Sequence, residues 1–537
     1  MKSFSPIAYQ QCTASGVDFV EAFRYQYVIS DVELQLPGFA THKLSSYVLQ
    51  TGNALKCEEL VDESGANFGY LFGVASSHNG WSAAKFLCDQ FNAHQNLAIS
   101  EFEERLCQLG GRFGVLVNIG GQDRLYVDAS GMIGAKFDRI RRTVAATVGL
   151  CIDRLPKQTR IPASANASFG LHLTEDDGVE RLNPNHYLDL KTFETARFWP
   201  REKDNFDLDQ SDYAAAIDEI VDAVRNILNV TCRENKVSLP LSGGFDSRAI
   251  FSIADDTTLQ NIEQIYTHIL TKINITDASV ANQLCALKGL GLEVHNALRN
   301  RRFSGLGDAD LVAKQFEIAS GGGATYHAFL PNGAAHRVGR DAVVLRGQQI
   351  PILRGLFVNN SDVGFWTSKT IADRVLELLH LNAVSEEVSQ TLTEKVNNIY
   401  SELPENAKLR AIDLLLVESV NGPDLSSWGC GVSHSFYTSP FNSRRMIQLF
   451  ASFDIRYRRE GHAMHALLLR ANPVLQTVAR TPQVRTIRAF EEDDSVNRRA
   501  IAFARQNDNF EKVFGERLPK HRMIRFRTDG ILERVRN

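Results

Sequence analysis

The chain has 537 residues, of which 44% are hydrophobic and 23% charged, and its formal net charge is -4. These values are ordinary for a globular protein with substantial cores, and the near-neutral charge gives no reason to expect nucleic acid or an anionic membrane as a partner. The eight cysteines form no CxxC pair, and no apolar run approaches the roughly 20 residues of a membrane span. We therefore expect a cytoplasmic protein that binds neither nucleic acid nor membranes.

The first part of the chain alternates short extended runs with glycine-rich turns. Such runs occupy residues 68–76, 113–120 and 124–131, and a capped helix is expected from Ser100 towards Gly110. The alternation of Val115, Val117 and Ile119 is the pattern of a half-buried strand. This part is therefore predicted to be rich in sheet, with a few helices.

A charged stretch without apolar periodicity, residues 199–212, is the candidate linker. An amphipathic helix follows over 217–228, with Asp209 or Ser211 as its expected cap. Strands are then expected at 236–241, 262–270, 292–298 and 341–347, with helices opening at Arg248 and spanning 278–291; the chain after about 370 reads as mostly helical. Strands separated by helices of this length predict a doubly wound parallel sheet.

The first of these strands ends at Leu241 and runs into the sequence Ser-Gly-Gly-Phe-Asp-Ser, residues 242–247. Two glycines allow the backbone amides to approach an anion, and the following helix presents its unpaired N–H groups. Ser242 and Ser247 add hydroxyl donors, while Asp246 suits a magnesium ion that bridges phosphate oxygens. A plain glycine turn with a serine cap is the simpler interpretation, but the whole string between a strand and a helix favours a phosphate site. Neither a Walker loop nor a dinucleotide fingerprint is present.

This string resembles the PP-loop of the ATP-pyrophosphatase superfamily, and the chain as a whole resembles the asparagine synthetase-like family. The segment 113–138 is similar to the late sheet of that family's glutaminase-type domain, and 169–190 to the segment that closes it, including Arg181-Leu182 and the run 185–188. The resemblance implies an N-terminal glutaminase-like αββα sandwich and a C-terminal PP-loop synthetase domain with extra helices. It also implies that ATP and Mg²⁺ form an acyl-adenylate, which an amine or ammonia captures.

The chain departs from the family pattern in two places. A glutamine-using member has a cysteine directly after the initiator methionine, as nucleophile, whereas Lys2 stands here and Cys12 lies too far along. The strand ending in Leu345 lacks the family's second acidic loop, with no acid before Asp362, and carries Arg346 and Arg354 instead. Either arginine can hold pyrophosphate or a substrate carboxylate; for Arg346, a simple ion pair with a nearby acid is an equal alternative.

Three further residues complete the candidate site. The resemblance implies that Thr267 contacts adenine through backbone groups, and that Lys520 offsets charge on the leaving phosphate. Asp277 is expected to cap the next helix. The residues expected to bind ATP are Leu241, Ser242, Gly243, Gly244, Asp246, Ser247 and Thr267, with Asp246 holding the metal and with Arg346 and Lys520 as the catalytic candidates.

These observations lead to a hypothesis of two domains, residues 1–205 and 206–537. The first is a degenerate glutamine amidotransferase-like domain, and the second joins a small-molecule or peptide carboxylate to an amine without hydrolysing glutamine, as in the β-lactam synthetase and lasso-cyclase branches of the family. The alternatives are a homologue of asparagine synthetase that uses free ammonia, and a non-catalytic nucleotide-binding or assembly protein. A PP-loop thiolase or RNA-modifying ligase would need paired cysteines and a basic module, which are absent. A homodimer is left open.

Overall fold

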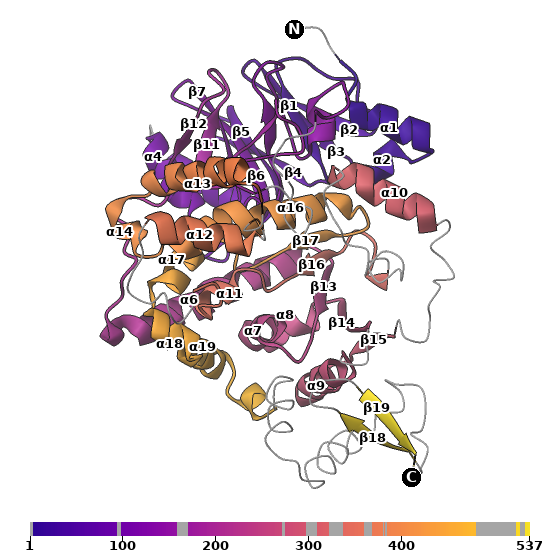
Figure 1. Cartoon of the computed structure of the whole chain (residues 1–537), viewed down its shortest axis with the longest axis vertical. Coiled ribbons are helices and arrows are strands. Elements are labelled where there is room, and N and C mark those ends of the chain that lie inside the picture. Colours follow the sequence, from indigo (N-terminus) through magenta and orange to yellow (C-terminus); the bar gives the residue numbers. More distant parts are fainter. Residues whose placement is uncertain are drawn as a thin grey trace.

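The computed structural model describes residues 4–93, 98–157, 170–270, 274–296, 309–321, 337–358, 368–379, 381 and 384–478, and the backbone of strands β18 (Arg522–Phe526) and β19 (Leu532–Arg536). Its architecture is mixed α/β (Figure 1). Two antiparallel sheets fill the N-terminal part, and a parallel sheet surrounded by helices follows.

Both N-terminal sheets have six strands and only antiparallel neighbours. In spatial order, the first consists of β10 (Glu180–Arg181), β8 (Lys136–Asp138), β9 (Thr143–Ala145), β1 (Tyr27–Ser30), β3 (Tyr47–Gly52) and β2 (Phe39–Leu44). The second consists of β12 (Thr195–Arg197), β11 (His186–Asp189), β7 (Gln122–Val127), β6 (Leu109–Ile119), β5 (Asn67–Ser77) and β4 (Cys57–Val61).

The two sheets pack face to face, with helices on their outer faces. Tyr27 of the first sheet and Phe72 and Leu116 of the second belong to one buried cluster. The first sheet is covered by α1 (Ile7–Ser15), α2 (Phe19–Ala22) and α5 (Val148–Cys151), and the second by α3 (Ala83–Ala93), α4 (Ile99–Leu106) and α6 (Tyr213–Glu234). The prediction that β6 is half-buried is wrong: Val115 and Val117 face the outer helices, and Leu116 is buried between the sheets.

The five-stranded parallel sheet confirms the predicted strand–helix alternation. Its order is β15 (Glu293–Asn296), β14 (Gln264–Ile269), β13 (Val237–Pro240), β16 (Val343–Leu345) and β17 (Phe436–Thr438), and every pair is parallel. The chain builds outwards from β13 to β15 and then returns to place β16 on the other side of β13. The winding direction therefore reverses between the neighbouring strands β13 and β16. Open α/β sheets bind ligands beyond the carboxyl ends of the strands at such a reversal point.

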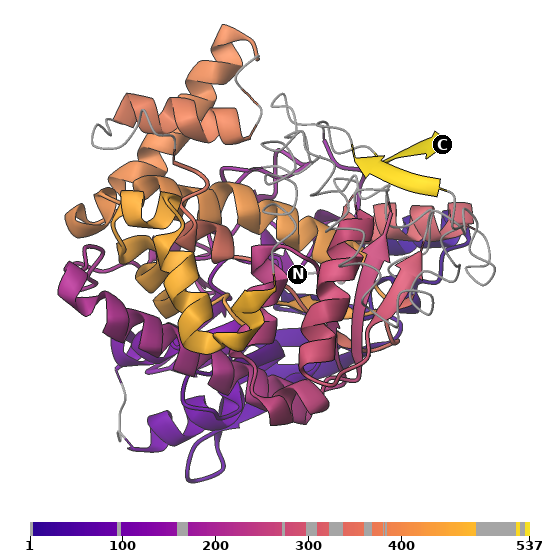
Figure 2. The ribbon, with the colours of Figure 1, turned by 90° about the horizontal axis from the view of Figure 1, so that it is seen from below.

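Helices surround this sheet (Figure 2). They are α7 (Phe245–Ile253), α8 (Asp256–Gln260), α9 (Asn274–Leu287), α10 (Ala309–Ser320), α11 (Ile350–Leu353), α12 (Ser368–Leu378), α13 (Glu386–Ser401), α14 (Glu405–Lys408), α15 (Ala411–Leu416), α16 (Gly422–Gly431), α17 (Arg444–Ser452), α18 (Ile455–Arg459) and α19 (His462–Ala471). A π-helical turn, Val417–Asn421, joins α15 to α16, and short 3₁₀ turns occupy Gln210–Asp212 and Val474–Thr477.

Several local predictions need correction. Helix α7 begins at Phe245, three residues before Arg248, because residues 242–247, which we call the glycine loop, form its N-terminus. Helix α9 begins at Asn274, so Asp277 lies in its first turn and is not its cap. Helix α6 has Asp212 at its N-cap, without a side-chain cap bond, so neither Asp209 nor Ser211 caps it. Strand β17 lies in a stretch predicted to be helical.

The two parts of the chain share one hydrophobic cluster and a buried polar network. We call this network the polar seam: the buried residues Asp128, Asn183, Asn185, Glu418, Asn442 and Arg444, together with Arg197, whose side chain is 9% exposed. Across it, Asn442 Nδ2 donates to Asp128 Oδ1 at 2.7 Å, and Arg444 Nη2 donates to the carbonyl of Val127 at 2.8 Å. The boundary proposed at 205/206 is therefore crossed by extensive packing, since α6 also lies on the second antiparallel sheet.

No helix within the described ranges has both the length and the hydropathy that crossing a bilayer would require.

Candidate functional site

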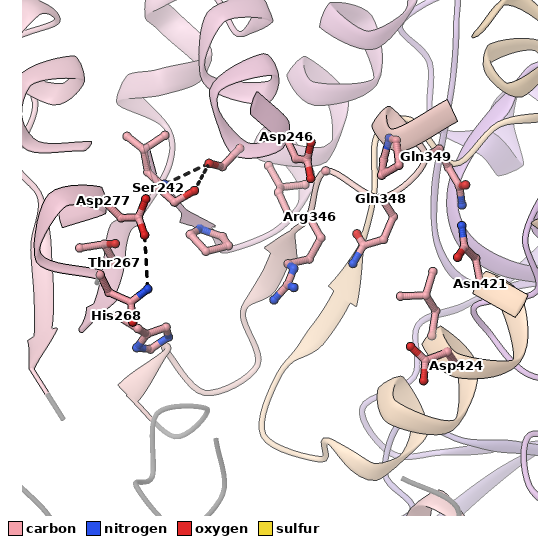
Figure 3. Close-up of a pocket in the computed structure, with 18 of the residues that line it drawn as sticks. Ser242, Asp246, Thr267, His268, Asp277, Arg346, Gln348, Gln349, Asn421 and Asp424 are labelled. Atoms are coloured by element: carbon pink, nitrogen blue, oxygen red, sulfur yellow. Dashed lines mark hydrogen bonds between the residues drawn. The ribbon is translucent and has the colours of Figure 1, made fainter. Parts of the chain in front are cut away.

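A pocket of about 450 Å³ lies beyond the carboxyl ends of β13, β14 and β16 (Figure 3). Its volume is within the range of roughly 300–1,000 Å³ that is typical of small-molecule sites. Its lining residues come from the glycine loop, β14, α9, the segment after β16 and α16: Pro240, Leu241, Ser242, Asp246, Ser247, Thr267, His268, Leu270, Asn274, Asp277, Leu345, Arg346, Gly347, Gln348, Gln349, Pro351, Phe357, Asn421, Asp424 and Leu425. The pocket is thus at the reversal point of the sheet.

The glycine loop is held in shape by its two serines. The backbone N–H of Ser242 donates to Ser247 Oγ at 3.0 Å, the two hydroxyls lie 3.1 Å apart, and the N–H of Gly244 approaches Ser242 Oγ at 3.3 Å. Gly244 is the N-cap of α7 and has no side chain to cap it. The first-turn amides of any helix lack intrahelical acceptors. Because no N-cap side chain accepts from those of α7, they are available to an anion.

Asp246 sits in the first turn of α7, with 44% of its side chain exposed. Its Oδ1 lies 3.3 Å from Arg354 Nη1. Burial raises the pKa of Asp246, and the positive charges of Arg354 and Arg346 act against this rise. One carboxylate with an available oxygen can hold magnesium when phosphate oxygens and water supply the other ligands. Over the described residues there is no ready-made group of three or more His, Cys, Asp or Glu for a metal.

Arg346 directly follows β16 and lines the pocket. Among the described residues it forms no ion pair, so the simple pairing with a nearby acid is not found there. Its guanidinium lies 5.6 Å from the ring centre of Trp428 and 6.0 Å from that of Tyr437. Such contacts favour a cation and leave its N–H groups available to an anionic ligand. Arg354, by contrast, is engaged with Asp246.

The other predicted residues divide into three groups. Thr267, at the carboxyl end of β14, is buried and lines the pocket, as does Asp277. Gly243 and Gly244 belong to the same loop as Ser242 and Ser247 but are not among the residues that line the pocket. Lys520 and Asp362 lie outside the described residues, and so does Lys2.

Sequence reasoning missed the wall opposite the glycine loop. Asp424 and Asn421, at the junction of the π-helical turn and α16, line the pocket together with Gln348 and Gln349. Burial raises the pKa of Asp424 to about 6. The available signal was a lone acid within a run of small and apolar residues, 422–432, which in a helix points to a buried position.

Gly347 controls how closely the segment after β16 approaches the glycine loop. A Cβ at this position would lie 2.6 Å from Asp246 Cβ and 2.7 Å from the Asp246 carbonyl oxygen. Gly347→Ala should therefore displace Asp246 and weaken ATP binding by about ten- to a hundredfold, the equivalent of roughly 1–3 kcal/mol of overpacking. Titration calorimetry with an ATP analogue that cannot be hydrolysed measures this.

Gly291→Ala is the matched control, because a Cβ there meets no atom within 4 Å. If both variants bound the analogue like the wild type, close contact between the two loops would have no part in nucleotide binding.

None of the eight cysteines has the properties of a nucleophile. Cys12, the nearest to the N-terminus, is buried in α1, and burial together with Asp18 raises the pKa of its thiol to about 12. Burial raises the pKa of every other cysteine as well. Thiols of this kind remain protonated at neutral pH and are unreactive.

No known protein-family model matches the chain, and a comparison with curated proteins found no match.

Proposed function

We propose that the protein is an ATP-dependent, AMP-forming amide ligase of the asparagine synthetase-like type. The observation that carries the proposal is the position of the 242–247 loop: it forms one wall of the pocket at the reversal point of a parallel sheet, and Arg346 lines the same pocket. In the proposal, residues 206–537 are the PP-loop synthetase domain, and residues 1–205 are a glutaminase-type domain that does not hydrolyse glutamine.

In the proposed reaction a carboxylate oxygen attacks the α-phosphorus of ATP, and the bond to pyrophosphate breaks. The N–H groups of α7 and the guanidinium of Arg346 stabilise the phosphate charge in a partly enclosed site, where such contacts contribute most. Magnesium held by Asp246 would neutralise phosphate oxygens. An amine then displaces AMP. The contribution of Lys520 remains a prediction.

ATP–pyrophosphate exchange tests the proposal. The purified protein, Mg-ATP and labelled pyrophosphate are assayed with a panel of amino-acid, hydroxy-acid and peptide carboxylates, and AMP is measured separately. We expect label in ATP with at least one carboxylate, AMP rather than ADP as product, and no glutamate released from glutamine.

Each alternative function predicts a different result in these assays. Asparagine formed from aspartate and ammonium would favour the ammonia-using homologue. ATP binding without exchange or AMP from any carboxylate would favour a non-catalytic nucleotide-binding protein, and glutamate release would overturn the assignment of the N-terminal part.

A further inference from the structure

The wall of the pocket opposite the glycine loop is rich in hydrogen-bond acceptors. We call it the acceptor wall: Gln348, Gln349, Asn421 and Asp424. Figure 3 shows Gln348 and Asp424 reaching into the same space as Arg346, from the segment after β16 and from α16. Among the described residues, Asp424 has no ion pair and no hydrogen bond through its side chain, although the pocket is also lined by the charged or titratable side chains of Asp246, His268, Asp277 and Arg346.

The orientation of Gln349 is set by its neighbour. Asn442 Nδ2 donates to the carbonyl of Gly111 and to Asp128, both at 2.7 Å, so its Oδ1 is the atom that faces Gln349. The Nε2 of Gln349 accordingly approaches that oxygen at 3.5 Å. Its Oε1 is left without a hydrogen-bond partner, although the side chain is only 1% exposed.

Gln348 repeats this feature, since its Oε1 is also buried without a partner. A buried acceptor without a donor is destabilising, and so is a partly buried carboxylate without a partner. Two amide oxygens and one carboxylate on this wall therefore receive no hydrogen bond from any described residue. A ligand group with several N–H donors and a positive charge satisfies all three.

We propose that the acceptor wall binds the amine that is joined to the activated carboxylate, and that Asp424 accepts the proton which this amine loses. The substrate class is a primary amine that is an ammonium ion in solution, on the same molecule as the carboxylate or on a second one. The binding part of the inference stands on the pocket alone, whereas the proton-transfer part rests on the proposed function.

The ammonium gives one proton to the Asp424 carboxylate, and the neutral nitrogen attacks the acyl carbon of the adenylate. The C–N bond forms, the C–O bond to phosphate breaks, and AMP leaves with the electron pair; the nitrogen loses its second proton to water. A carboxyl with a pKa of about 6 is mostly ionised at neutral pH and is a stronger base than an ordinary carboxylate.

The effect of replacing Asp424 on stability distinguishes a functional role from a structural one. Asp424→Asn keeps the side-chain shape and removes a partly buried charge that forms no ion pair with any described residue. The variant should therefore be as stable as the wild type or more stable, as is common when a functional residue is replaced. A residue that held the fold together would lower the melting temperature when replaced.

Binding of ω-amino acids tests the amine site without any ATP turnover. Compounds of three to six carbons are compared by calorimetry with the unsubstituted carboxylates of the same length, using wild type, Asp424→Asn and Asp256→Asn. Asp256 is a matched control because its side chain is 74% exposed, on α8. We expect the wild type and the control to prefer at least one amino acid by about tenfold, the equivalent of one favourable charge contact, and Asp424→Asn to lose this preference but keep its affinity for carboxylates.

The amine site is overturned if the wild type shows no such preference, if Asp424→Asn retains it, or if Asp424→Asn weakens both classes equally. Failure of the ligase proposal is separate, since it appears as absence of AMP while the amine preference persists. Where exchange occurs, Asp424→Asn should retain it and lose about 10²–10⁴-fold in amide formation; equal loss of both steps would overturn the role as base.

Discussion

Asp246→Asn is expected to slow conversion of ATP to AMP by at least about a hundredfold while leaving the fold intact. The substitution keeps the shape of the side chain but removes the negative charge proposed to hold magnesium, and the loss of one such stabilising group commonly costs roughly 10²–10³ in rate. The fold should tolerate it because burial raises the pKa of Asp246, which means that its charge is not favoured by the native state. Arg354, its partner at 3.3 Å, is partly exposed.

AMP release at saturating ATP, measured over a range of Mg²⁺ concentrations, checks this prediction. The wild type should gain activity as the pH rises through the raised pKa of Asp246, since a metal ligand must be deprotonated, and the variant should lack this rise. Asp222→Asn, on the exposed side of α6, serves as the control. Unchanged turnover by Asp246→Asn would remove the basis of the proposed ATP site.

Glu418→Gln should lower the free energy of unfolding by about 3 kcal/mol, the cost typical of breaking a buried ion pair. Glu418 lies in the polar seam with a fully buried side chain and accepts hydrogen bonds from Arg197, Asn185 and Asn183. Burial raises its pKa, but these partners outweigh burial and bring the pKa to about 2. The glutamine leaves the guanidinium of Arg197, whose side chain is largely buried, with only the half-exposed Glu402 as a counter-charge.

The pH dependence of this loss has a definite sign. Because the pKa of Glu418 in the folded protein lies below its value of about 4.3 in an unfolded chain, its stabilising contribution is complete above that value and disappears as the pH falls towards 2. Urea unfolding at pH 7.5 and at pH 4 measures the difference between variant and wild type. Glu402→Gln is the control: this residue is 46% exposed and 3.6 Å from Arg197, so it should cost less than about 1 kcal/mol. Equal losses in the two variants would contradict the role given to the seam.

The sequence predicted the parallel sheet well because its strands and helices carry strong local signals. Short apolar runs, glycine turns and the long amphipathic pattern of α6 depend on neighbours in the chain. The fifth strand was missed because Phe436–Thr438 has only three residues, and its strand character depends on pairing with β16. The double-sided burial of β6 was missed for a similar reason, since Leu116 packs against residues of the first sheet, which local periodicity does not reveal.

The part of the site that could be predicted consists of the contiguous glycine loop and of residues near the carboxyl ends of predicted strands. The loop 242–247, Thr267 and Arg346 line one pocket because the carboxyl ends of parallel strands share an edge. Asp424 was not predictable in this way, because about 180 residues separate it from the loop and only the path of α16 brings it there. Arg354 shows the converse: it appeared suitable for a substrate anion, but the fold places it against Asp246.

The polar seam also bears on how such a chain can evolve. Asn442 and Arg444 donate hydrogen bonds to Asp128, Val127 and Asn185, so deleting everything before residue 206 would remove these partners and expose one face of α6. A change that shortened the chain by removing the two antiparallel sheets would therefore also have to replace the polar side chains of the second half that these sheets now satisfy. Such a step needs several substitutions at once, which favours retention of the whole chain.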